Sequence, residues 1–344
     1  MVQFPGPPSV PPASPLATNQ KQPLKEPVKN MRRSRRDADA YVPKIMKQGP
    51  VVPWLYLAPA LVVMTIFIVY PGVQTLILSL MNKDSTQSAT AACISGQACW
   101  GIFENYRYAL TSEIMRTAFL NNLKWILVMV TSTVVLGLLV AVLADRVRYE
   151  PLAKAIIFMP MAISFVGAGV IWTFVYNYGT GVNQIGLLNA IAVALGGQPV
   201  SWLSEPAINT LALIFVGIWM WTGFCMTVLS ASIKSVPVEM LEAARVDGAT
   251  EIQAFQHITI PTIMPTLAVI TTTMVINVLK VFDIVYVMTG GNYNTEVIAN
   301  RMYIDMYSTH NAGRATAIAV ILILVTIPVM IYNVRRFQEQ EASR

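Results

Sequence analysis

Six long stretches without a charged residue constrain this chain more than any other feature of its sequence. Each is about 20 residues or longer and mostly apolar, which is the length a helix needs to cross a bilayer core of about 30 Å. Continuous apolar runs also exclude a β-barrel, whose strands must alternate in polarity. We therefore predict an all-α integral membrane protein with six transmembrane helices, at 51–82, 125–144, 155–176, 206–233, 258–279 (running on past Lys280 and Asp283 to about 289) and 315–334.

The composition agrees with this prediction. The 344 residues are 55% hydrophobic and 12% charged, with a mean hydropathy of +0.54, whereas soluble domains carry about a quarter charged residues. Another uncharged segment, 177–204, is broken by five glycines and a proline. We interpret it as a loop with a short helix at 183–195, and a seventh span within it is the alternative.

Lysine and arginine placement indicates the orientation. Residues 1–50 carry nine of them, and the segments 145–154, 234–257 and 335–344 carry more, all on one side of a six-span chain. Because cytoplasmic segments are enriched in these residues, both termini are expected in the cytoplasm. The net charge of +6 then reflects topology, and no nucleic-acid partner is expected.

The two ends of the chain are expected to lie outside the membrane-spanning domain. Residues 1–50 are rich in Pro, Ser, Gln and Lys, which favours a disordered basic cytoplasmic arm, and 335–344 form a cytoplasmic tail. The first apolar run begins near Val51, so we expect an uncleaved anchor and no cleavable signal peptide. The domain between these ends is 51–334.

The three cysteines have different expected roles. Cys93 and Cys99 flank a five-residue loop on the predicted outer side, where disulfides are permitted; whether they are bonded stays open. No histidine lies nearby, so a metal site is not expected. Cys225 lies within the fourth span and is expected to be a small buried residue.

The cytoplasmic segment between the fourth and fifth spans predicts a helical hairpin at 237–261. Pro237 suits a first helical turn, and Gly248 is placed to end the first helix in a left-handed cap. Thr250 followed by Gln253 predicts a capping box that opens the second helix, and Pro261 marks the start of the next span.

The surface of this hairpin suits contact with a soluble partner. Ala243 and Ala244 allow close approach, and Glu242 and Asp247 offer polar anchors beside them. An interfacial lipid-binding helix is the alternative, but such helices carry Lys and Arg on their polar face, and this one is acidic or neutral.

The same residues carry a resemblance to a known family. Glu242-Ala-Ala, three residues, Gly248, nine residues and Ile258-Thr-Ile-Pro match the EAA loop of binding-protein-dependent ABC importer permeases, which reads EAA, three residues, G, nine residues, I-x-L-P. Ile260 replaces the usual Leu. The resemblance implies the type I ABC importer permease fold and makes Glu242, Ala243, Ala244 and Gly248, with Asp247, the coupling site for an ATPase subunit.

Two further segments narrow the resemblance to carbohydrate importers. The run 281–291 with Thr295-Glu296, and Phe103-Glu-Asn-Tyr106, are similar to maltose-type permeases. The resemblance covers about 51–338, and Thr289 to Glu341 looks most like alpha-glucoside permeases.

The resemblance also implies the partners of the chain. They are ABC ATPase subunits, a second homologous permease, an extracytoplasmic sugar-binding protein that docks on the loops 83–118, 177–207 and 290–313, the sugar substrate and membrane lipid, all at the bacterial inner membrane. No G-x-x-x-x-G-K-[ST] loop occurs in the sequence, so ATP and Mg belong to the separate ATPase. No cofactor is expected on this chain, and it is not itself an enzyme.

Polar and aromatic residues within the spans are the candidates for sugar binding. Polar and ionisable residues inside a membrane are functional candidates by default, so Asn277 and Lys280 are expected to face a cavity and bind hydroxyls. Trp221 and Phe224 are expected to stack on a sugar ring. Pairing of Lys280 with Asp283, three residues on, is the alternative, and the partner permease is the alternative holder of the sugar.

Two other function classes compete. An ion-coupled secondary transporter would need titratable groups at the midplane, and only Lys280 and Asp283 approach this. An intramembrane protease is disfavoured because no H-E-x-x-H occurs and His257 and His310 fall on opposite sides of the predicted membrane. Among ABC importers, glycerol phosphate is the alternative to a di- or oligosaccharide.

Overall fold

The computed structural model describes residues 51–81 as helices and their ends, together with residues 101–179 and 186–342. Residues 51–65 form a unit by themselves, the helix α2 (Val51–Met64) with the first residue of a π-turn, η2 (Thr65–Val69). All regular elements of the described residues are helices. The expected N-terminal arm, Cys93 and Cys99 lie outside the described residues.

The second unit begins at Ile66. Its helical elements in chain order are α3 (Tyr70–Ser79), α5 (Ile102–Thr111), α6 (Glu113–Lys124), η3 (Trp125–Val130), α7 (Thr131–Ala144), α8 (Glu150–Phe158), η4 (Met159–Ala162), α9 (Phe165–Val175), α10 (Leu187–Ala194), α11 (Asn209–Lys234), α12 (Val238–Val246), α13 (Glu251–Ala254), η5 (Phe255–Thr259), α14 (Ile260–Leu279), α15 (Asp283–Met288), α16 (Ile298–Tyr303), η6 (Ile304–Ser308) and α17 (Ala312–Ala342).

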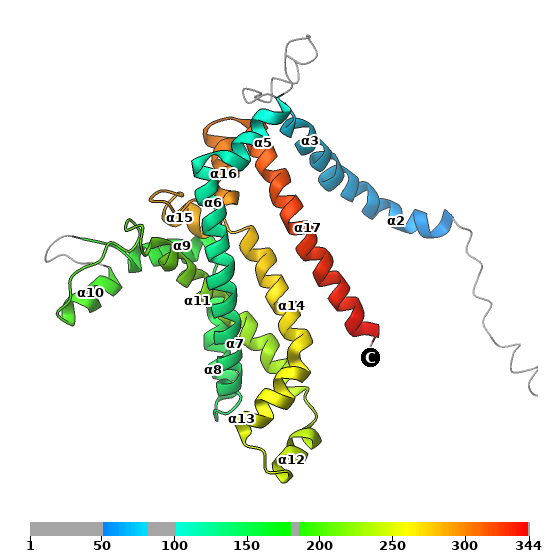
Figure 1. The fold of residues 1–344 in the computed structure, drawn as a ribbon, viewed down its shortest axis with the longest axis vertical. Helices are drawn as coiled ribbons and strands as arrows, with labels where there is room; N and C mark the ends of the chain where they lie inside the picture. Colours follow the sequence, from blue (N-terminus) through cyan, green and yellow to red (C-terminus); the bar gives the residue numbers. More distant parts are fainter. Residues whose placement is uncertain (1–50, 82–100, 180–185, 343–344) are drawn as a thin grey trace, which may run out of the picture. The chain divides into compact units, whose positions relative to one another are not determined.

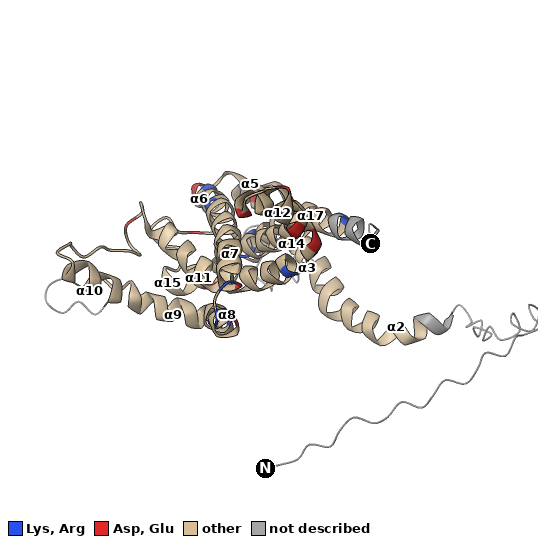
Figure 2. Ribbon diagram, turned by 90° about the horizontal axis from the view of Figure 1, so that it is seen from below, with Lys and Arg blue, Asp and Glu red and all other residues tan. Residues whose placement is uncertain are grey.

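Five helices among the described residues are long and apolar enough to cross a membrane, or six if one bent pair forms a single span. Most of the ribbon along these helices carries no charged residue (Figure 2). The five are Trp54–Ser79, Glu113–Ala144, Asn209–Lys234, Glu251–Leu279 and Ala312–Arg335. Helices therefore occupy all six predicted stretches, and the exact span count depends on the third.

The third stretch is not the straight helix that its apolar run predicts. The helical pair Glu150–Ala162 and Phe165–Val175 bends by 98°. Pro160 lies in the short 3₁₀ turn η4, Ile163 is extended, and the Ser164 hydroxyl caps α9 by accepting from the Gly167 amide at 3.0 Å. Proline and a local side-chain cap thus interrupt the helix, an effect that hydropathy does not report.

Helix α11 lies at the centre of the packed core. Leu213, Met226 and Leu229 on this helix are completely buried. Three glycines make close helix contacts around it, because a Cβ at Gly137 would meet Cys225 Cβ at 2.5 Å and one at Gly223 would meet the Ile157 carbonyl oxygen at 2.5 Å. The third, Gly217, faces Met129 and Trp125. Small residues at such contacts are typical of membrane helix packing.

The two ends of the second unit carry different structures. Figure 1 shows α12 and α13 at one end and α5, α15 and α16 at the opposite end. Between them run the long helices α6–α7, α11, α14 and α17. The candidate sites therefore lie at separate levels of the same helix bundle.

Candidate functional site

The predicted hairpin is present, and its first helix ends as the sequence indicates. Helix α12 is closed by Gly248, whose φ is +83°. The Ala249 amide donates to the Ala244 carbonyl at 2.9 Å and the Gly248 amide to the Arg245 carbonyl at 3.1 Å. These two bonds form a Schellman motif, which needs a left-handed residue at Gly248.

The second helix opens with the predicted capping box. The Thr250 hydroxyl accepts from the Gln253 amide at 3.3 Å, and the Gln253 side chain accepts from the Thr250 amide at 2.8 Å. Pro261 does not start a separate span, because α13, η5 and α14 run on without a break from Glu251 to Leu279. The π-turn η5 directly before Pro261 accommodates the missing proline N–H.

The predicted coupling residues form an exposed surface on this hairpin. Glu242, Ala243, Asp247 and Gly248 are exposed, and Ala244 is half-buried. They lie on the second half of α12 (Val238–Val246) and the turn that follows it, at the end of the bundle where Figure 1 shows α12. This arrangement leaves small side chains and backbone accessible to another molecule.

Two apolar side chains beside these residues were not predicted as part of the surface. Val246 is 87% exposed and Ile252 is 70% exposed. Val238 is exposed as well, while Leu241 packs against the core. Val238 and Leu241, three residues apart on α12, therefore have different surroundings. Exposed aliphatic residues beside the turn indicate a surface that contacts another molecule, and the spacing of residues in the sequence does not reveal such exposure.

An ion pair joins the two arms of the hairpin across its turn. Arg245 Nε lies 2.8 Å from Glu251 Oε1, and both side chains are more than half exposed. Hydrogen bonding to Glu251 raises the pKa of Arg245. A cavity of about 170 Å³ is lined by this pair on one side and by Asp145 and Arg146, at the end of α7, on the other.

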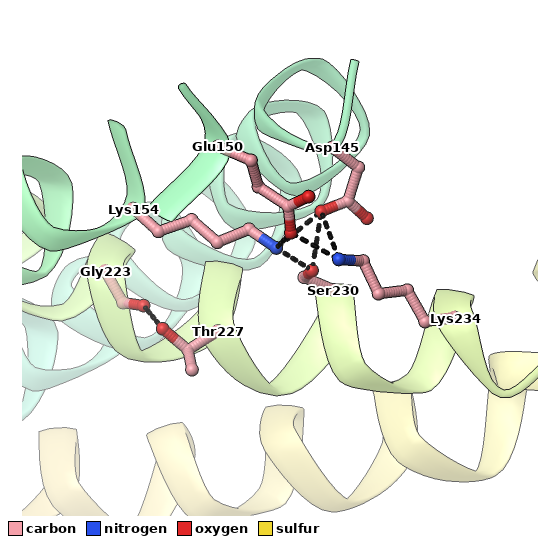
Figure 3. Close-up of polar contacts among 7 residues, drawn as sticks. All are labelled: Asp145, Glu150, Lys154, Gly223, Thr227, Ser230 and Lys234. Atoms are coloured by element: carbon pink, nitrogen blue, oxygen red, sulfur yellow. Dashed lines mark hydrogen bonds and ion pairs between the residues drawn. The ribbon is translucent and has the colours of Figure 1, made fainter. Parts of the chain in front are cut away.

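A second ionic group, the α7–α8–α11 cluster, lies near the hairpin and consists of Asp145, Glu150, Lys154, Ser230 and Lys234 (Figure 3). Lys154 Nζ donates to Asp145 Oδ1 at 2.5 Å, Glu150 Oε1 at 2.6 Å and Ser230 Oγ at 2.5 Å. Lys234 completes the cluster by pairing with Glu150. The sequence analysis used the two lysines only as topology signals and gave the two acids and Ser230 no role.

A cavity of about 140 Å³ lies where α14 ends. Its polar lining consists of Asn277, Lys280 and Asp283. Aromatic rings supply most of the remaining wall, namely Trp125, Phe165, Trp221 and Phe282. Aromatic faces with a few polar groups are the lining that a sugar site requires, although ligand pockets usually reach 300 Å³ or more.

Three of the four predicted substrate residues come together in this cavity. Trp221, Asn277 and Lys280 line it, and Phe224 does not. The Phe224 ring instead packs edge-on against Trp221, with 5.6 Å between ring centroids. Phe224 therefore supports the wall of the cavity from behind.

Trp125 is a cavity residue that sequence reasoning missed. It is completely buried, and its indole N–H has no hydrogen-bond partner among the described residues. The opposite edge of its ring is fixed, because a Cβ at Gly217 would lie 3.1 Å from Trp125 Cζ3. A buried unpaired donor is costly, so this N–H is a group that a bound hydroxyl could satisfy. The sequence analysis gave Trp125 no role beyond the start of the second span.

Lys280 and Asp283 do not share a helix face. Helix α14 ends at Leu279, Lys280 caps it, and α15 begins at Asp283. No ion pair joins the two side chains in the described part of the chain, and both line the cavity. The helix break separates the residues that three-residue spacing had suggested as a pair.

A second, larger hollow of about 540 Å³ borders the same lysine. Apart from Lys280, Tyr303 and Thr326, its lining is apolar, and it runs along α17 from Ala319 to Met330. Such a surface suits lipid or another hydrophobic helix, and it lacks the polar groups that would orient a sugar.

The segment after α15, residues 289–300, is held by distant asparagines. Asn121 Nδ2 donates to the Asn294 carbonyl at 2.6 Å and the Glu296 carbonyl at 2.9 Å. Asn122 Oδ1 accepts from the Ile298 amide at 2.9 Å, and Asn209 Nδ2 donates to the Tyr293 carbonyl at 2.7 Å. Four residues of the segment have positive φ: Gly290, Gly291, Tyr293 and Asn294.

Two acids of this region are buried. Asp305 pairs with Arg301, and Glu296 Oε1 accepts from Asn300 Nδ2 at 2.6 Å and from the Val297 amide at 3.1 Å. Burial raises the pKa of Glu296. No group of three or more His, Cys, Asp or Glu side chains that could hold a metal occurs in the described residues.

Comparisons with known proteins agree with this geometry. The family described as "Binding-protein-dependent transport system inner membrane component" matches residues 109–339. The osmoprotective compounds uptake permease protein of Synechocystis sp. is 51% identical over 291 residues, 84% of this chain and 100% of that protein. The alpha-glucoside transport system permease protein of Rhizobium meliloti is 45% identical over 285 residues, 82% of this chain and 81% of that protein.

The fold has a solved counterpart. The crystal structure of a bacterial ABC transporter involved in the import of the acidic polysaccharide alginate contains a chain with a TM-score of 0.69. The match covers 90% of this chain and 99% of that one at 22% identity, which shows the importer permease fold.

Proposed function

The chain belongs to the family of inner-membrane components of binding-protein-dependent transport systems, and we propose that it is the subunit through which ATP hydrolysis drives import of a neutral glucoside. As a member of that family it is a multi-pass protein of the bacterial inner membrane. The homologous chains are permease subunits and not enzymes.

The hairpin carries this proposal. Its turn is fixed by a Schellman motif and a capping box, yet Glu242, Ala243 and Gly248 are exposed to solvent. A rigid, exposed surface of small, acidic and aliphatic residues suits a pocket on a soluble protein better than a lipid surface. Glu242, Ala243, Ala244, Asp247 and Gly248 are proposed to contact the ATPase subunit.

The proposed assembly has four kinds of component. ATPase subunits use ATP and Mg and bind the hairpin, a second permease completes the path, and an extracytoplasmic protein delivers the sugar to the opposite end. The 51–334 domain spans the membrane six times, with the bent third pair counted as one span. Residues 1–50 and 335–344 are then cytoplasmic, as is the hairpin.

The substrate proposal rests on the 140 Å³ cavity. Trp221 and Trp125 supply aromatic faces and one unpaired N–H, and Asn277 and Lys280 supply polar groups. Lys280 and Asp283 both line the cavity, so the site carries one charge of each sign. This lining favours a neutral polyhydroxylated ligand over an anion such as glycerol phosphate. Since the cavity is small for a disaccharide, it must widen or be completed by the partner permease.

An osmoprotective compound is the second candidate substrate. The 51% identical permease is named for such compounds, and the 45% identical one for alpha-glucosides. Uptake of labelled maltose, trehalose and glycine betaine by the assembled importer in proteoliposomes separates the two. Uptake of a sugar supports the glucoside, and uptake of betaine alone supports a zwitterionic osmoprotectant.

The coupling role has a matched test. Gly248 and Gly196 have φ of +83° and +82°, and a Cβ at either would meet no described atom within 4 Å. Gly248→Pro is expected to leave the protein inserted but to lower sugar-stimulated ATP hydrolysis by the assembled importer more than tenfold. Gly196→Pro makes the same backbone change on the loop where the binding protein is expected to dock, so it is the control for assembly: ATP hydrolysis without binding protein and sugar is expected to stay within twofold of the wild type.

A second variant separates surface charge from backbone strain. Glu242→Lys reverses an exposed charge without altering the turn, and it is expected to give the same loss of stimulated hydrolysis. Unchanged hydrolysis in both Gly248→Pro and Glu242→Lys would contradict the coupling assignment.

A further inference from the structure

We propose that Lys154 is a positioning residue for ATP-driven transport: it clamps the ends of α7, α8 and α11 into one rigid body against which the hairpin moves α14. This inference rests on the proposed function. It starts from the α7–α8–α11 cluster, which lies outside the EAA motif and outside the cavity (Figure 3).

The ammonium group of Lys154 makes all of its hydrogen bonds within this cluster. An ammonium group has three N–H donors, and those of Lys154 meet acceptors from three helix ends: Asp145 on α7, Glu150 on α8 and Ser230 on α11. The Ser230 hydroxyl also donates to Asp145 Oδ1 at 2.8 Å. The Lys154 side chain is only 20% exposed and that of Asp145 only 15%, so water competes weakly for these bonds.

The clamp extends a tightly packed contact between α8 and α11. Gly223, Thr227, Ser230 and Lys234 recur at helical spacing on one face of α11. A Cβ at Gly223 would lie 2.5 Å from the Ile157 oxygen and 2.7 Å from Phe158 Cα, so the two backbones touch. Thr227 turns its hydroxyl inward to the Gly223 carbonyl at 2.8 Å. The contact is therefore close along its length and ionic at its end.

The opposite end of this contact forms one wall of the cavity. Trp221 on α11 and Phe165 at the start of α9 lie with their ring centroids 6.0 Å apart, and both line the cavity. Trp125 and Met129, just before α7, belong to the same wall. The other wall, from Asn277 to Ile284, belongs to the end of α14 and the residues after it.

The hairpin connects these two walls. Pro237, where the hairpin begins, follows Lys234 by three residues, so the first arm of the hairpin starts next to the α7–α8–α11 cluster. The other arm is the uninterrupted helix from Glu251 to Leu279. A force on the hairpin can displace one wall relative to the other only if α11 does not slip along α7 and α8. Lys154 prevents this slip.

The test measures sugar uptake per ATP hydrolysed by the complete importer in proteoliposomes, with maltose as the probe. Lys154→Met keeps a linear side chain of similar length but removes the charge. We expect the ATPase to remain bound and hydrolysis to continue, with uptake per ATP falling about tenfold. Lys154→Arg, which retains the charge and several donors, is expected to stay within threefold of the wild type.

A compensated variant separates positioning from stability. Lys154→Met leaves the Asp145 and Glu150 carboxylates with Lys234 as the one cation of the cluster, which lowers stability. Adding Asp145→Asn and Glu150→Gln removes those two negative charges and is expected to restore the melting temperature, while uptake per ATP stays low because no ion pair joins the three helices.

Either of two results would overturn the inference: wild-type uptake per ATP in Lys154→Met, or recovery of that ratio together with stability in the compensated variant. A failure of the proposed function looks different. In that case the wild-type importer takes up no sugar with ATP, or the hairpin variants hydrolyse ATP normally.

Discussion

The hairpin at 237–261 and the 289–300 segment both contain left-handed glycines, but they are stabilised in opposite ways. Hydrogen bonds between residues at most six apart hold the hairpin, and its charges are exposed. Side chains from α6 and α11, between 84 and 176 residues away, hold the 289–300 segment. The hairpin is thus a self-contained surface, whereas the 289–300 segment is part of the folded core.

The largest expected effect comes from one substitution made in both regions. Gly248 and Gly291 have the same φ of +83°, but only at Gly291 would a Cβ collide, at 2.6 Å from both Glu296 Oε1 and Asn300 Nδ2. Gly248→Ala is expected to cost about 1–2 kcal/mol of stability from backbone strain. Gly291→Ala adds displacement of buried side chains and is expected to cost about 3 kcal/mol or more. Thermal unfolding in detergent compares the two, and equal losses would mean that the buried neighbours of Gly291 yield freely.

Removing one hydrogen-bonding side chain in each region is expected to give the next largest difference. Asn122→Ala leaves the buried Ile298 amide without its acceptor and should cost about 2 kcal/mol. Thr250→Ala removes the helix cap of the hairpin and should cost about 1 kcal/mol. Hydrogen exchange at residues 289–300 should rise only in Asn122→Ala; a rise in both variants would show that the two regions unfold together.

A change of pH is expected to alter the stability of the 289–300 segment more than that of the hairpin. Burial raises the pKa of Glu296 above its ordinary value, so the folded state binds this proton more tightly than the unfolded state does. The resulting stability is present at low pH and is lost as pH rises through the raised pKa. The other ionisable groups are the same in both proteins, so the measurement is the melting temperature of wild type minus that of Glu296→Gln at several pH values. A difference that does not change with pH would show that folding leaves the pKa of Glu296 unshifted.

The smallest effect is expected at the Arg245–Glu251 pair. Both side chains are more than half exposed, and exposed ion pairs contribute little to stability. Arg245→Ala should therefore leave the melting temperature unchanged at both low and high salt. A salt-dependent loss of stability would instead make this pair a real connection between the two arms of the hairpin.

The same contrast explains what the sequence could predict. The turn at Gly248 and the cap formed by Thr250 and Gln253 depend on residues only a few positions apart. Their geometry was therefore predicted correctly from the sequence. The apolar runs likewise predicted helices at all six stretches. Asn121, Asn122 and Asn209 gave no signal, because their partners lie far along the chain and spacing does not report them. Trp125 was missed for the same reason.

Two local predictions were wrong in ways that also have physical causes. Lys280 and Asp283 were placed on one helix face, but the helix ends at Leu279. The third stretch, 155–176, was predicted as one transmembrane helix, but the chain breaks at Pro160 and the Ser164 cap into two helices bent by 98°. Hydropathy measures how apolar a run is, and it contains no information about where a helix breaks inside that run.

The unbroken helix from Glu251 to Leu279 has a mechanical consequence. At 1.5 Å per residue, about 40 Å separates its hairpin end from Asn277. A rigid rod of that length amplifies rotation, so each degree of tilt shifts the far end by roughly 0.7 Å. Under the proposed function, a few degrees imposed on the hairpin by the ATPase subunit would be enough to change the width of the cavity at the far end of this helix.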